Sequence, residues 1–327
     1  MTWKDLPAGP AECLAQLKAA GKAAYPVGGW VRDRLLGREA GDVDLCTAAL
    51  PEEVMALFPA AVPTGLAHGT VTVPTVSGNV EITTFRREGG YADARHPDAV
   101  TFDVGLTEDL SRRDFTVNAM ALAEDGTVVD PFGGRKDLKR GLIRCVGEAE
   151  RRFSEDALRM LRALRFKAQL GFELEEETGR ALRTNAHRVE KVSRERLRAE
   201  VEKTLLSPRP WVVGEMIEMG LLDHLYVFPE GVDLSGLAAL PAAPEERWRG
   251  FCNATGFPIA ILPVERKLRR AVEHPEAAII PTLALKPGDL MAMGLTGPEI
   301  SAAQKRLALH VLEQPEDNRA EKLRELL

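Results

Sequence analysis

The first 140 residues contain short runs in which hydrophobic and polar side chains alternate, and this period of two predicts β-strands. The alternation is clearest at residues 68–73 and 80–85, and the Ser-Gly-Asn sequence at 77–79 predicts that these two strands form a hairpin. Apolar residues at helical spacing at 10–20 and 51–58 predict helices beside the strands. This part of the chain is therefore expected to mix strands and helices.

The periodicity changes near Gly141, where the strand patterns stop and helical spacing takes over. Residues 153–166 predict one helix with an apolar stripe, and residues 184–206 predict another, with a helix start near Ser193. Weaker helical patterns follow in a remainder rich in Pro and Ala, at residues 211–222, 245–252, 265–272, 289–293, 298–311 and 318–327. This order of elements indicates an α+β protein whose strands are confined to its N-terminal part.

Residues 25–45 combine a glycine turn with two closely spaced carboxylates. An apolar run ends at Gly28 and Gly29, and a Gly-Gly turn between a strand and a helix lets backbone N–H groups approach a phosphate without interference from a Cβ atom. Further on, Asp42 and Asp44 alternate with apolar residues, so both carboxylates are expected on one face of an extended segment. Two hard oxygen ligands beside a triphosphate suit Mg²⁺, with phosphate oxygens completing its shell. Either motif alone also fits an ordinary turn or a solvated strand edge, whereas their order and spacing together favour a nucleotide site.

Three further features of the N-terminal part leave alternatives open. Glu81, in the second strand of the hairpin, is either an exposed strand residue or a third carboxylate that faces the aspartate pair. Residues 86–100 contain glycines and charges without an apolar period, which predicts a mobile loop or a solvated connection. Arg112 and Arg113 precede Asp114 and an apolar run, and arginine there either clamps phosphate with both arms of its guanidinium or simply pairs with Asp114.

The predicted helix at 153–166 has an unusual polar side. Asp156, Arg159 and Arg162 progress around the side opposite the apolar stripe, and Arg165 falls near the border. Any one of these residues alone fits the solvated face of a helix that packs on a core. A carboxylate with three arginines and hardly any lysine favours recognition of a base, because guanidinium forks and carboxylates match the hydrogen-bonding edges of bases.

Charge is distributed unevenly along the chain. The 327 residues have a net charge of −6, but residues 131–210 hold 20 Lys and Arg against 13 Asp and Glu, a local charge of +7. A basic middle between acidic flanks predicts a local phosphate-binding surface rather than a wholly basic protein.

The sequence carries no pattern of a membrane, disulfide or zinc protein. No apolar run approaches the roughly 20 residues of a membrane span, and the start lacks the apolar region of a signal peptide, so we expect a cytoplasmic protein without a membrane partner. Cys13, Cys46, Cys145 and Cys252 lack disulfide or zinc spacing and are expected to be buried thiols.

The glycine turn followed by Gly-Asp-x-Asp resembles the signature of nucleotidyltransferases of the DNA polymerase β-like superfamily. Residues 10–206 are similar to the class II tRNA nucleotidyltransferases, the CCA-adding enzymes that are related to bacterial poly(A) polymerases, and the remainder is similar more loosely. The matching positions are Gly28, Gly29 and Arg32 of the nucleotide-phosphate motif, Asp42 and Asp44 as metal-binding aspartates, Arg113 and Asp114 of the R-R-D motif, Asp156 and Arg159 of the E-D-x-x-R motif, and Arg162 and Arg165 after it.

The resemblance implies an enzyme that adds nucleotides to tRNA without a nucleic-acid template. The 3′-hydroxyl of a tRNA would attack the α-phosphorus of CTP or ATP and release pyrophosphate, with Mg²⁺ held by Asp42 and Asp44 and with Glu81 as a further catalytic candidate. Asp156 and Arg159 would hydrogen-bond the Watson–Crick edge of the incoming base and so replace a template.

The architecture that the resemblance implies has four parts. They are a catalytic head with a small mixed β-sheet at residues 1–140, a helical neck that recognises the base at 141–206, a helical body at 207–285, and a helical tail that binds tRNA at 286–327. The region after residue 206 is shorter than in longer members of the family, which bears on how the acceptor stem is held.

Relatives of narrower specificity fit the same motifs, namely A-adding enzymes, CC-adding enzymes and poly(A) polymerases. CC-adding relatives have a shortened loop at the position of residues 86–100, and the full-length loop here favours addition of the terminal A. From a different class, a catalytically silent RNA-binding module is disfavoured by the pair Asp42 and Asp44, because carboxylates without a metal repel phosphate. The sequence does not predict the oligomeric state.

Overall fold

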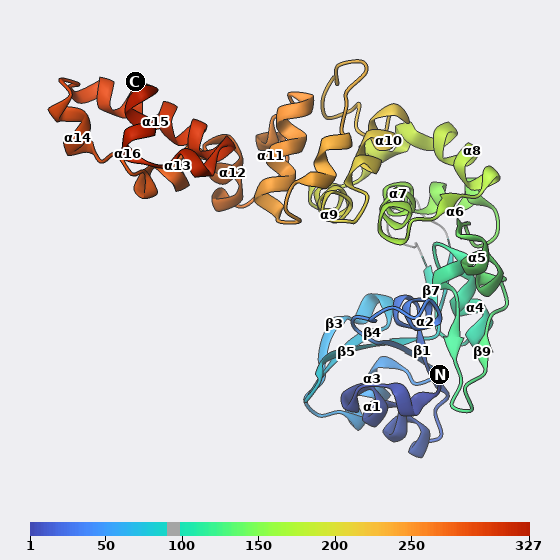
Figure 1. The fold of residues 1–327 in the computed structure, drawn as a ribbon. Helices are drawn as coiled ribbons and strands as arrows, with labels where there is room; N and C mark the ends of the chain where they lie inside the picture. The colour runs from blue at the N-terminus through green and yellow to red at the C-terminus, as the bar shows by residue number, and fades with distance from the viewer. Residues whose placement is uncertain (90–98) are drawn as a thin grey trace.

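The computed structural model describes residues 1–89 and 99–327, which form a curved, elongated molecule (Figure 1). The head lies at one end, the chain turns through the neck, and the body and tail extend away so that the C-terminus lies far from the sheet. Residues 90–98, which form most of the loop predicted at 86–100, lie outside the described residues.

The head is built on a seven-stranded mixed sheet, which confirms the expected fold class. Neighbouring strands are antiparallel except β2 and β5, which run parallel with Leu45 opposite Ile82. The predicted hairpin is confirmed as β4 and β5, which pair from Thr70 opposite Thr83 to Thr75 opposite Gly78. In sheet order the strands are β3 (Val62–Gly65), β4 (Thr70–Thr75), β5 (Gly78–Thr84), β2 (Asp44–Thr47), β1 (Ala24–Val27), β8 (Ala121–Leu122) and β9 (Val128–Val129).

Most of the remaining described chain is helical, and none of the described helices is long and apolar enough to cross a membrane. The α-helices are α1 (Ala8–Ala19), α2 (Gly29–Leu35), α3 (Pro51–Leu57), α4 (Leu106–Ser111), α5 (Gly134–Arg140), α6 (Ala149–Glu155), α7 (Leu158–Leu170), α8 (Glu176–Asn185), α9 (Arg194–Leu205), α10 (Val213–Glu218), α11 (Pro244–Thr255), α12 (Arg266–Glu273), α13 (Glu276–Ile279), α14 (Pro287–Ala292), α15 (Gly297–Glu313) and α16 (Ala320–Glu325). Short 3₁₀ helices are η1 (Trp3–Asp5), η2 (Leu66–His68), η3 (Thr116–Asn118), η4 (Ala186–Lys191), η5 (Pro210–Val212), η6 (Ser235–Ala239), η7 (Ile259–Ile261), η8 (Ile280–Thr282) and η9 (Pro315–Asp317).

The two faces of the head sheet have different roles. Val71 and Ile82 are fully buried in the core to which α1 and α3 also contribute. Asp44 and Glu81 alternate with these buried positions and are exposed on the other face. The alternation that predicted the strands therefore also separates the core face from the face that carries the carboxylates.

Two short ladders fall where the sequence patterns predicted no strand. β6 (Arg87–Gly89) and β7 (Ala99–Thr101) pair antiparallel, so the described ends of the predicted loop are strands. β10 (Leu142–Ile143) and β11 (Glu173–Leu174) pair in parallel in the neck, so the expectation of helices alone after Gly141 is corrected. Ladders of two or three residues are too short to produce a readable alternation.

The single helix predicted at 153–166 is wrong, because the chain breaks at Asp156. α6 ends at Glu155, Asp156 has an extended backbone with φ −145° and ψ 106°, and α7 begins at Leu158. The Asp156 carboxylate accepts a hydrogen bond from the backbone N–H of Leu158 at 3.0 Å. An aspartate side chain that accepts a hydrogen bond from a nearby backbone N–H replaces the backbone carbonyl that would accept it in a continuous helix. The spacing of apolar residues, from which the helix was predicted, carries no information about such a side-chain hydrogen bond.

The helix predicted at 184–206 is also divided. α8 ends at Asn185, η4 follows, and α9 begins at Arg194 directly after Ser193. The predicted helix start near Ser193 is therefore confirmed, while the continuous helix before it is not.

Three hydrophobic cores hold the described chain together, and the smallest lies in the head around Val27, Cys46 and Leu110. The first extends from Leu14 in α1 to Val272 in α12, so the head, neck and body share one continuous core. The second core belongs to the C-terminal helices and includes Leu283, Leu285, Leu290, Leu307 and Leu323. It begins just before the boundary expected at residue 286.

The cysteines are all free thiols. Cys13, Cys46 and Cys145 are buried as predicted, whereas Cys252 is half-buried. Burial raises the pKa of Cys145 to about 12, so this thiol remains protonated at neutral pH.

Candidate active site

The turn after β1 requires glycine at position 28. Gly28 has φ 73° and ψ −132°, which L side chains rarely adopt, and a Cβ atom there would lie 3.1 Å from Nη1 of Arg113. The antiparallel register of β1 and β2 places Val27 opposite Asp44, directly beside this turn. The fold therefore brings the glycine turn, the second aspartate and Arg113 to one place.

Asp42, Asp44 and Glu81 form the acidic side of the site. Because β2 and β5 are parallel, Asp44 and Glu81 lie on neighbouring strands and the same face of the sheet. Loss of surrounding water is the main cause that raises the pKa of Asp44 to about 6; the negative charge of Glu81 also raises it, and Arg113 opposes the shift. Glu81 is thus an exposed strand residue that also faces Asp44, so the two alternatives for it do not exclude each other.

The chemistry of this donor set is compatible with Mg²⁺. Within the described residues, no hydrogen bond or ion pair occupies the carboxylates of Asp42 and Asp44. In the same part of the chain, no group of three or more His, Cys, Asp or Glu side chains is arranged to hold a metal ion. Two available carboxylates fit a hard cation that completes its shell from substrate oxygens and water rather than from a protein cage.

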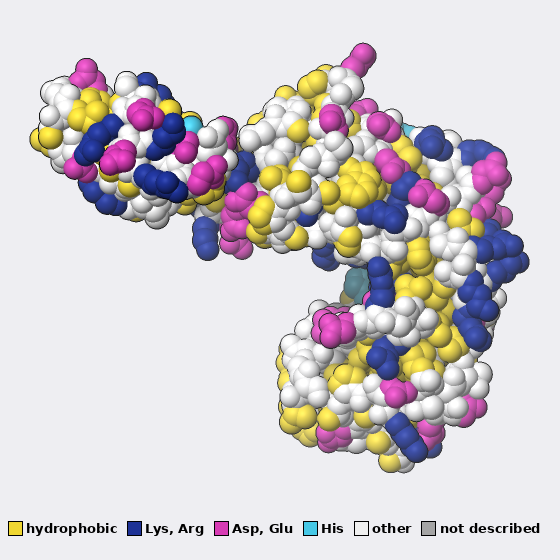
Figure 2. All heavy atoms as spheres, in the orientation of Figure 1, with side chains coloured by type: hydrophobic (Ala, Val, Ile, Leu, Met, Phe, Trp, Pro, Cys, Tyr) yellow, Lys and Arg dark blue, Asp and Glu magenta, His cyan; other side chains and the backbone are white. Residues whose placement is uncertain are grey.

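A cavity of about 470 Å³ joins the glycine turn to the start of α7. Its surroundings are visible in Figure 2, where the surface is hollowed between the head and the upper part of the molecule and Lys and Arg side chains line the rim. The lining residues are Gly28, Gly29, Arg32, Asp44, Arg112, Arg113, Asp114, Asn118, Asp156, Leu158, Arg159, Arg162, Arg165, Phe166 and Arg196. Every predicted nucleotide-binding residue is in this lining, whereas Asp42 and Glu81 are not.

The arginine pair of the R-R-D motif is held by a carboxylate that the sequence did not single out. Nη2 of Arg112 and Nη2 of Arg113 lie 2.8 Å and 3.4 Å from the carboxylate of Asp109, which is completely buried. The alternative in which these arginines pair with Asp114 is therefore wrong. The partner of Asp114 is Arg162 on α7, which donates from Nε and Nη2 at 2.8 Å and 2.6 Å.

Asp114 is ionised in spite of its burial. Burial alone would raise its pKa, but the charge and hydrogen bonds of Arg162, with further donors from Asn118 and the backbone of Phe115, hold the pKa at about 2. The geometry therefore makes Asp114 the anchor of Arg162 in the wall of the cavity.

The ion pair of Asp114 with Arg162 should make the free energy of unfolding depend on pH in the acid range. A carboxyl whose pKa is lower in the folded chain than in the unfolded chain stabilises the fold above the unfolded pKa, which is 3.8 here. This stabilisation is lost as the pH falls from about 4 towards 2 and amounts to about 2 kcal/mol. We expect urea unfolding to show a smaller loss of stability over this range for Asp114→Asn than for the wild type. Parallel curves for the two proteins would contradict the assignment.

Phe166 is a central part of the cavity that the sequence did not predict. The guanidinium carbons of Arg32, Arg162 and Arg165 lie 5.1, 5.4 and 4.0 Å from the centre of its ring, within the range of cation–π attraction. Arg32 also donates to Oδ1 of Asn118 at 2.7 Å. Phe166 follows Arg162 by four residues on α7, and residues at this spacing lie on the same side of a helix. The sequence could therefore have indicated that Phe166 lies beside Arg162.

Asp156 and Arg159 lie at the far end of the cavity and are held by their neighbours. Nη2 of Arg196 on α9 donates to Asp156 at 2.7 Å, across 40 residues of sequence. Nη1 of Arg159 donates to Glu155 at 2.7 Å, and Nη2 donates to the carbonyl of Arg112 at 3.1 Å. Asp156 lies in the extended break and Arg159 lies in the helix α7, and the side chains of both residues line the same cavity.

α9 supplies a second partner that no local pattern indicated. Arg165, which is buried, forms an ion pair with the buried Glu200 of α9. α9 therefore makes two charged contacts here, from Arg196 to Asp156 in the break before α7 and from Glu200 to Arg165 on α7.

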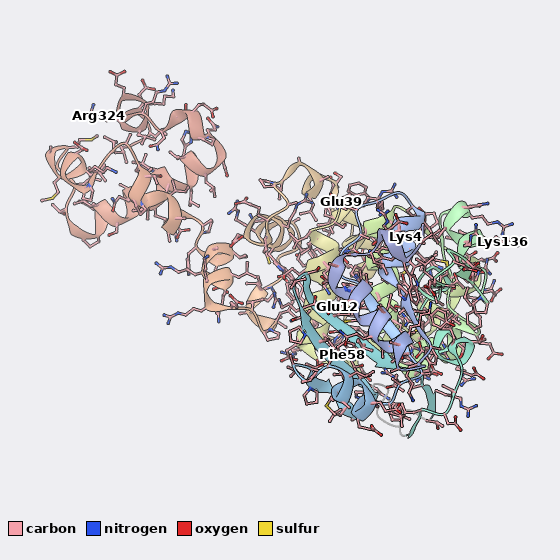
Figure 3. All side chains as sticks on the ribbon, turned by 90° about the horizontal axis from the view of Figure 1, so that it is seen from below. Lys4, Glu12, Glu39, Phe58, Lys136 and Arg324 are labelled. Atoms are coloured by element: carbon pink, nitrogen blue, oxygen red, sulfur yellow. The ribbon has the colours of Figure 1, made fainter. Side chains whose placement is uncertain are left out.

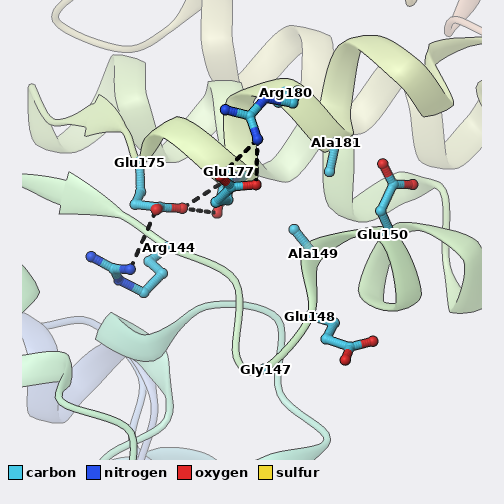
Figure 4. Close-up of a pocket in the computed structure, with 10 residues that line it drawn as sticks. Arg144, Gly147, Glu148, Ala149, Glu150, Glu175, Glu177, Arg180 and Ala181 are labelled. Carbon is cyan, nitrogen blue, oxygen red and sulfur yellow. Dashed lines mark hydrogen bonds and ion pairs between the residues drawn. The ribbon is translucent and has the colours of Figure 1, made fainter.

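A second hollow of about 400 Å³ lies in the neck between α8 and the start of α6 with the two residues before it (Figure 4). Arg144 pairs with Glu175 at 3.4 Å, and Arg180 pairs with Glu177 at 2.7 Å. The guanidinium groups in this hollow are thus neutralised by adjacent carboxylates. None of the predicted site residues lines it, and we assign it no role in the reaction.

Comparisons with known proteins find similarity over most of the chain. Residues 24–144 match the family described as the poly A polymerase head domain, and residues 171–233 match the family described as the probable RNA and SrmB-binding site of polymerase A. The chain is 47% identical to the CCA-adding enzyme of Geobacillus thermodenitrificans over 84% of its own length and 70% of that protein. It is 49% identical to the CCA-adding enzyme of Geobacillus stearothermophilus over 74% of its own length and 62% of that protein. The chain thus spans between six and seven tenths of these curated relatives.

Solved structures show the same arrangement over most of the chain. The crystal structure of the Bacillus stearothermophilus CCA-adding enzyme in complex with CTP superposes with a TM-score of 0.68 at 35% identity, covering 93% of this chain and 92% of that one. A tRNA nucleotidyltransferase complexed with a primer tRNA and an incoming ATP analogue superposes with a TM-score of 0.65 at 25% identity, covering 96% of this chain and 97% of that one.

Proposed function

The chain belongs to the family of the CCA-adding enzymes, and we propose that it adds the 3′-terminal CCA sequence to tRNA from CTP and ATP without a nucleic-acid template. Relatives of this name, and solved neighbours described with CTP and with a primer tRNA and an ATP analogue, support this proposal. A reaction on tRNA also keeps the cytoplasm as the expected compartment.

The cavity that joins Asp44 to Asp156 and Arg159 carries the proposal. One end offers a carboxylate beside a glycine turn, which suits a cation and a phosphate, and the other end offers an acceptor and a donor that suit a base edge. Arginines line the space between them, as a triphosphate requires. A silent RNA-binding module has no need for such a path between carboxylates and base-recognition groups.

We propose that Asp42 and Asp44 hold Mg²⁺ and that Arg113, between Gly28 and Asp44, contacts the triphosphate. When bound, Mg²⁺ would neutralise phosphate charge and activate the attacking hydroxyl. Glu81 adds negative charge beside Asp44 and so strengthens the attraction of this face for a cation. The protein then holds the tRNA 3′-hydroxyl in line with the α-phosphorus while pyrophosphate leaves, and positioning supplies most of the catalysis.

Base choice is proposed to reside in Asp156 and Arg159, with Arg162 and Arg165 shaping the cavity beside them. Asp156 would accept from the exocyclic amine that cytosine and adenine share, and Arg159 would donate to acceptors of the base. Arg32, Asp114 and Gly29 are proposed to support the triphosphate and sugar. We also propose the division expected from the sequence, into a head at 1–140, a neck at 141–206, a body at 207–285 and a tail at 286–327.

The function is tested by a single-turnover assay on tRNA substrates that end before the first C, before the second C, and before the terminal A. Each NTP is supplied alone and in combination. A CCA-adding enzyme extends all three substrates to the same end point with CTP and ATP. An A-adding enzyme extends only the third substrate, a CC-adding enzyme stops before A, and a poly(A) polymerase adds several A residues.

α12 is a candidate surface for the tRNA backbone at the junction of body and tail. Arg266, Lys267, Arg269 and Arg270 are exposed on this short helix, and only Arg269 among them has an ion pair within the described chain, with Glu273. Figure 2 shows Lys and Arg side chains over this junction. Replacing Arg266, Lys267 and Arg270 together by alanine should weaken tRNA binding, and the slope of log affinity against log salt should fall by about one unit for each phosphate that the variant no longer binds.

A matched control removes three exposed cations from the head, outside the basic residues 131–210, namely Lys4, Lys18 and Arg38. Lys4 lies on the head, far from Arg324 of the tail (Figure 3), so the control changes the net charge equally without touching the body and tail. Filter-binding measurements over a range of salt compare the two triple variants. An equal loss of tRNA affinity in both would refute a specific role of α12.

A further inference from the structure

A fully buried carboxylate of the head is used by no step proposed so far. Asp109 lies on α4, next to Leu110, which packs in a small core with Val27, Cys46 and Phe85. An ionised carboxylate in such surroundings is costly unless charged or hydrogen-bonding partners surround it. The hydrogen-bond and ion-pair partners of Asp109 therefore indicate which side chains it holds in place.

The two oxygens of Asp109 have different partners. Oδ1 accepts from Nε of Arg112 at 2.9 Å and from the backbone N–H of Arg86 at 3.3 Å. Oδ2 accepts from Nη2 of Arg113 at 3.4 Å. One buried side chain thus joins the arginine pair to the segment that leads from β5 into β6.

Arg113 depends on this contact for its direction. Asp109 is its hydrogen-bond and ion-pair partner in the described chain, and its Nε is buried there without a hydrogen-bond partner. On its other side, Nη1 lies 3.1 Å from the position of a Cβ atom at Gly28. Its charge also acts on Asp44. The guanidinium therefore lies between the buried anchor and the proposed phosphate and metal end of the cavity.

Arg112 connects Asp109 to Arg159 at the end of the cavity that is proposed to bind the base. Its side chain is fixed on Oδ1 of Asp109, and its backbone carbonyl accepts from Nη2 of Arg159 at 3.1 Å. A shift of the Arg112 segment would therefore move an acceptor that helps to orient Arg159.

We propose that Asp109 is a positioning residue of the nucleotide site, which aims Arg113 at the triphosphate and, through Arg112, supports the orientation of Arg159. This inference rests on the proposed function, because it assigns Arg113 to the triphosphate. Asp109 itself is buried away from the cavity lining and acts only through the arginines.

Asp109→Asn is the sharpest test, because the two side chains have the same shape. An asparagine oxygen at the Oδ1 position keeps the contacts to Arg112 and Arg86, while its amide replaces Oδ2 and turns a donor towards Arg113. The affinity for CTP and for ATP, measured by calorimetry with Mg²⁺ and without tRNA, should fall about ten-fold or more. The melting temperature and tRNA affinity are measured in parallel.

A double-mutant cycle separates positioning from a general structural role. If Asp109 acts through Arg113, Asp109→Asn should add little to Arg113→Ala, so the double variant should bind CTP within about two-fold of Arg113→Ala alone. The matched control is Asp137→Asn, since Asp137 is also a buried carboxylate of the head but contacts Thr116 and Arg144 instead. The fold-changes in CTP affinity caused by Asp137→Asn and by Arg113→Ala should multiply in the double variant, as expected for independent sites.

Two results would overturn the inference. One is a multiplicative effect of Asp109→Asn and Arg113→Ala, as expected for the control, and the other is a fall in melting temperature with unchanged CTP affinity. Failure of the proposed function is distinguishable, because a wild type that binds CTP but extends no tRNA refutes the reaction while the binding cycle still measures the role of Asp109.

Discussion

Replacing Asp44 or Asp42 by alanine is expected to abolish nucleotide transfer while tRNA binding stays within a few fold of the wild type. Asp44 lies beside the Gly28 turn and the charge of Asp42 acts on it, and loss of metal stabilisation worth several kcal/mol corresponds to a fall in rate of about a thousand-fold or more. The measurement is single-turnover extension of tRNA in Mg²⁺, combined with filter binding of tRNA.

The matched control for these variants is Glu39→Ala. Glu39 is an exposed carboxylate in the segment that leads from α2 to Asp42, and its removal changes the net charge equally without removing a proposed ligand. Its rate should stay close to that of the wild type. Substantial turnover by Asp44→Ala or Asp42→Ala would disprove the assignment of the metal to this pair.

Asp156→Asn is expected to change which nucleotide is added rather than whether one is added. The asparagine oxygen can keep the hydrogen bond from the backbone N–H of Leu158, so α7 still begins where it does, but one acceptor becomes a donor. Discrimination among the four NTPs should relax by about 1–3 kcal/mol, the contribution of a good contact to a base edge. The ratios of kcat/KM for the four NTPs measure this effect.

Arg159→Ala should relax the same discrimination, because it removes the donor at this end of the cavity. Arg180→Ala serves as the control, since Arg180 lies in the second hollow of the neck and outside the lining of the cavity. If Asp156→Asn and Arg159→Ala lowered the rate equally for all four NTPs, this end of the cavity would hold phosphate and the template analogy would be wrong.

The parts of the site that the sequence predicted are those set by neighbours along the chain. Gly28 was predicted because a Gly-Gly turn between a strand and a helix leaves backbone N–H groups free to approach a phosphate, and its φ of 73° is a conformation that favours glycine. Asp42 and Asp44 were predicted to share a face because successive side chains of an extended segment alternate. Both arguments require only local geometry, which sequence carries directly.

The errors of the sequence interpretation have a common physical origin. The helix break at Asp156 arises from competition between a side-chain and a backbone acceptor, which apolar periodicity does not measure. The ladder of β10 and β11 joins segments 31 residues apart, from Leu142 to Glu173, and each strand is too short to show a pattern. In both cases a hydrogen bond, rather than the distribution of apolar residues, decided the structure.

Patterns along the chain were enough to predict a mixed N-terminal part followed by a mainly helical remainder, the hairpin of β4 and β5, the glycine turn, and charged residues that line the cavity, but not the partners of these residues on α4 and α9. The pairing of those charges depends instead on how the folded chain packs. In the folded chain, ion pairs join Arg112 and Arg113 to Asp109, Arg162 to Asp114, and Arg165 to Glu200. The reason is that an arginine can satisfy any carboxylate that burial brings within reach, and burial is set by how distant segments meet rather than by spacing along the chain.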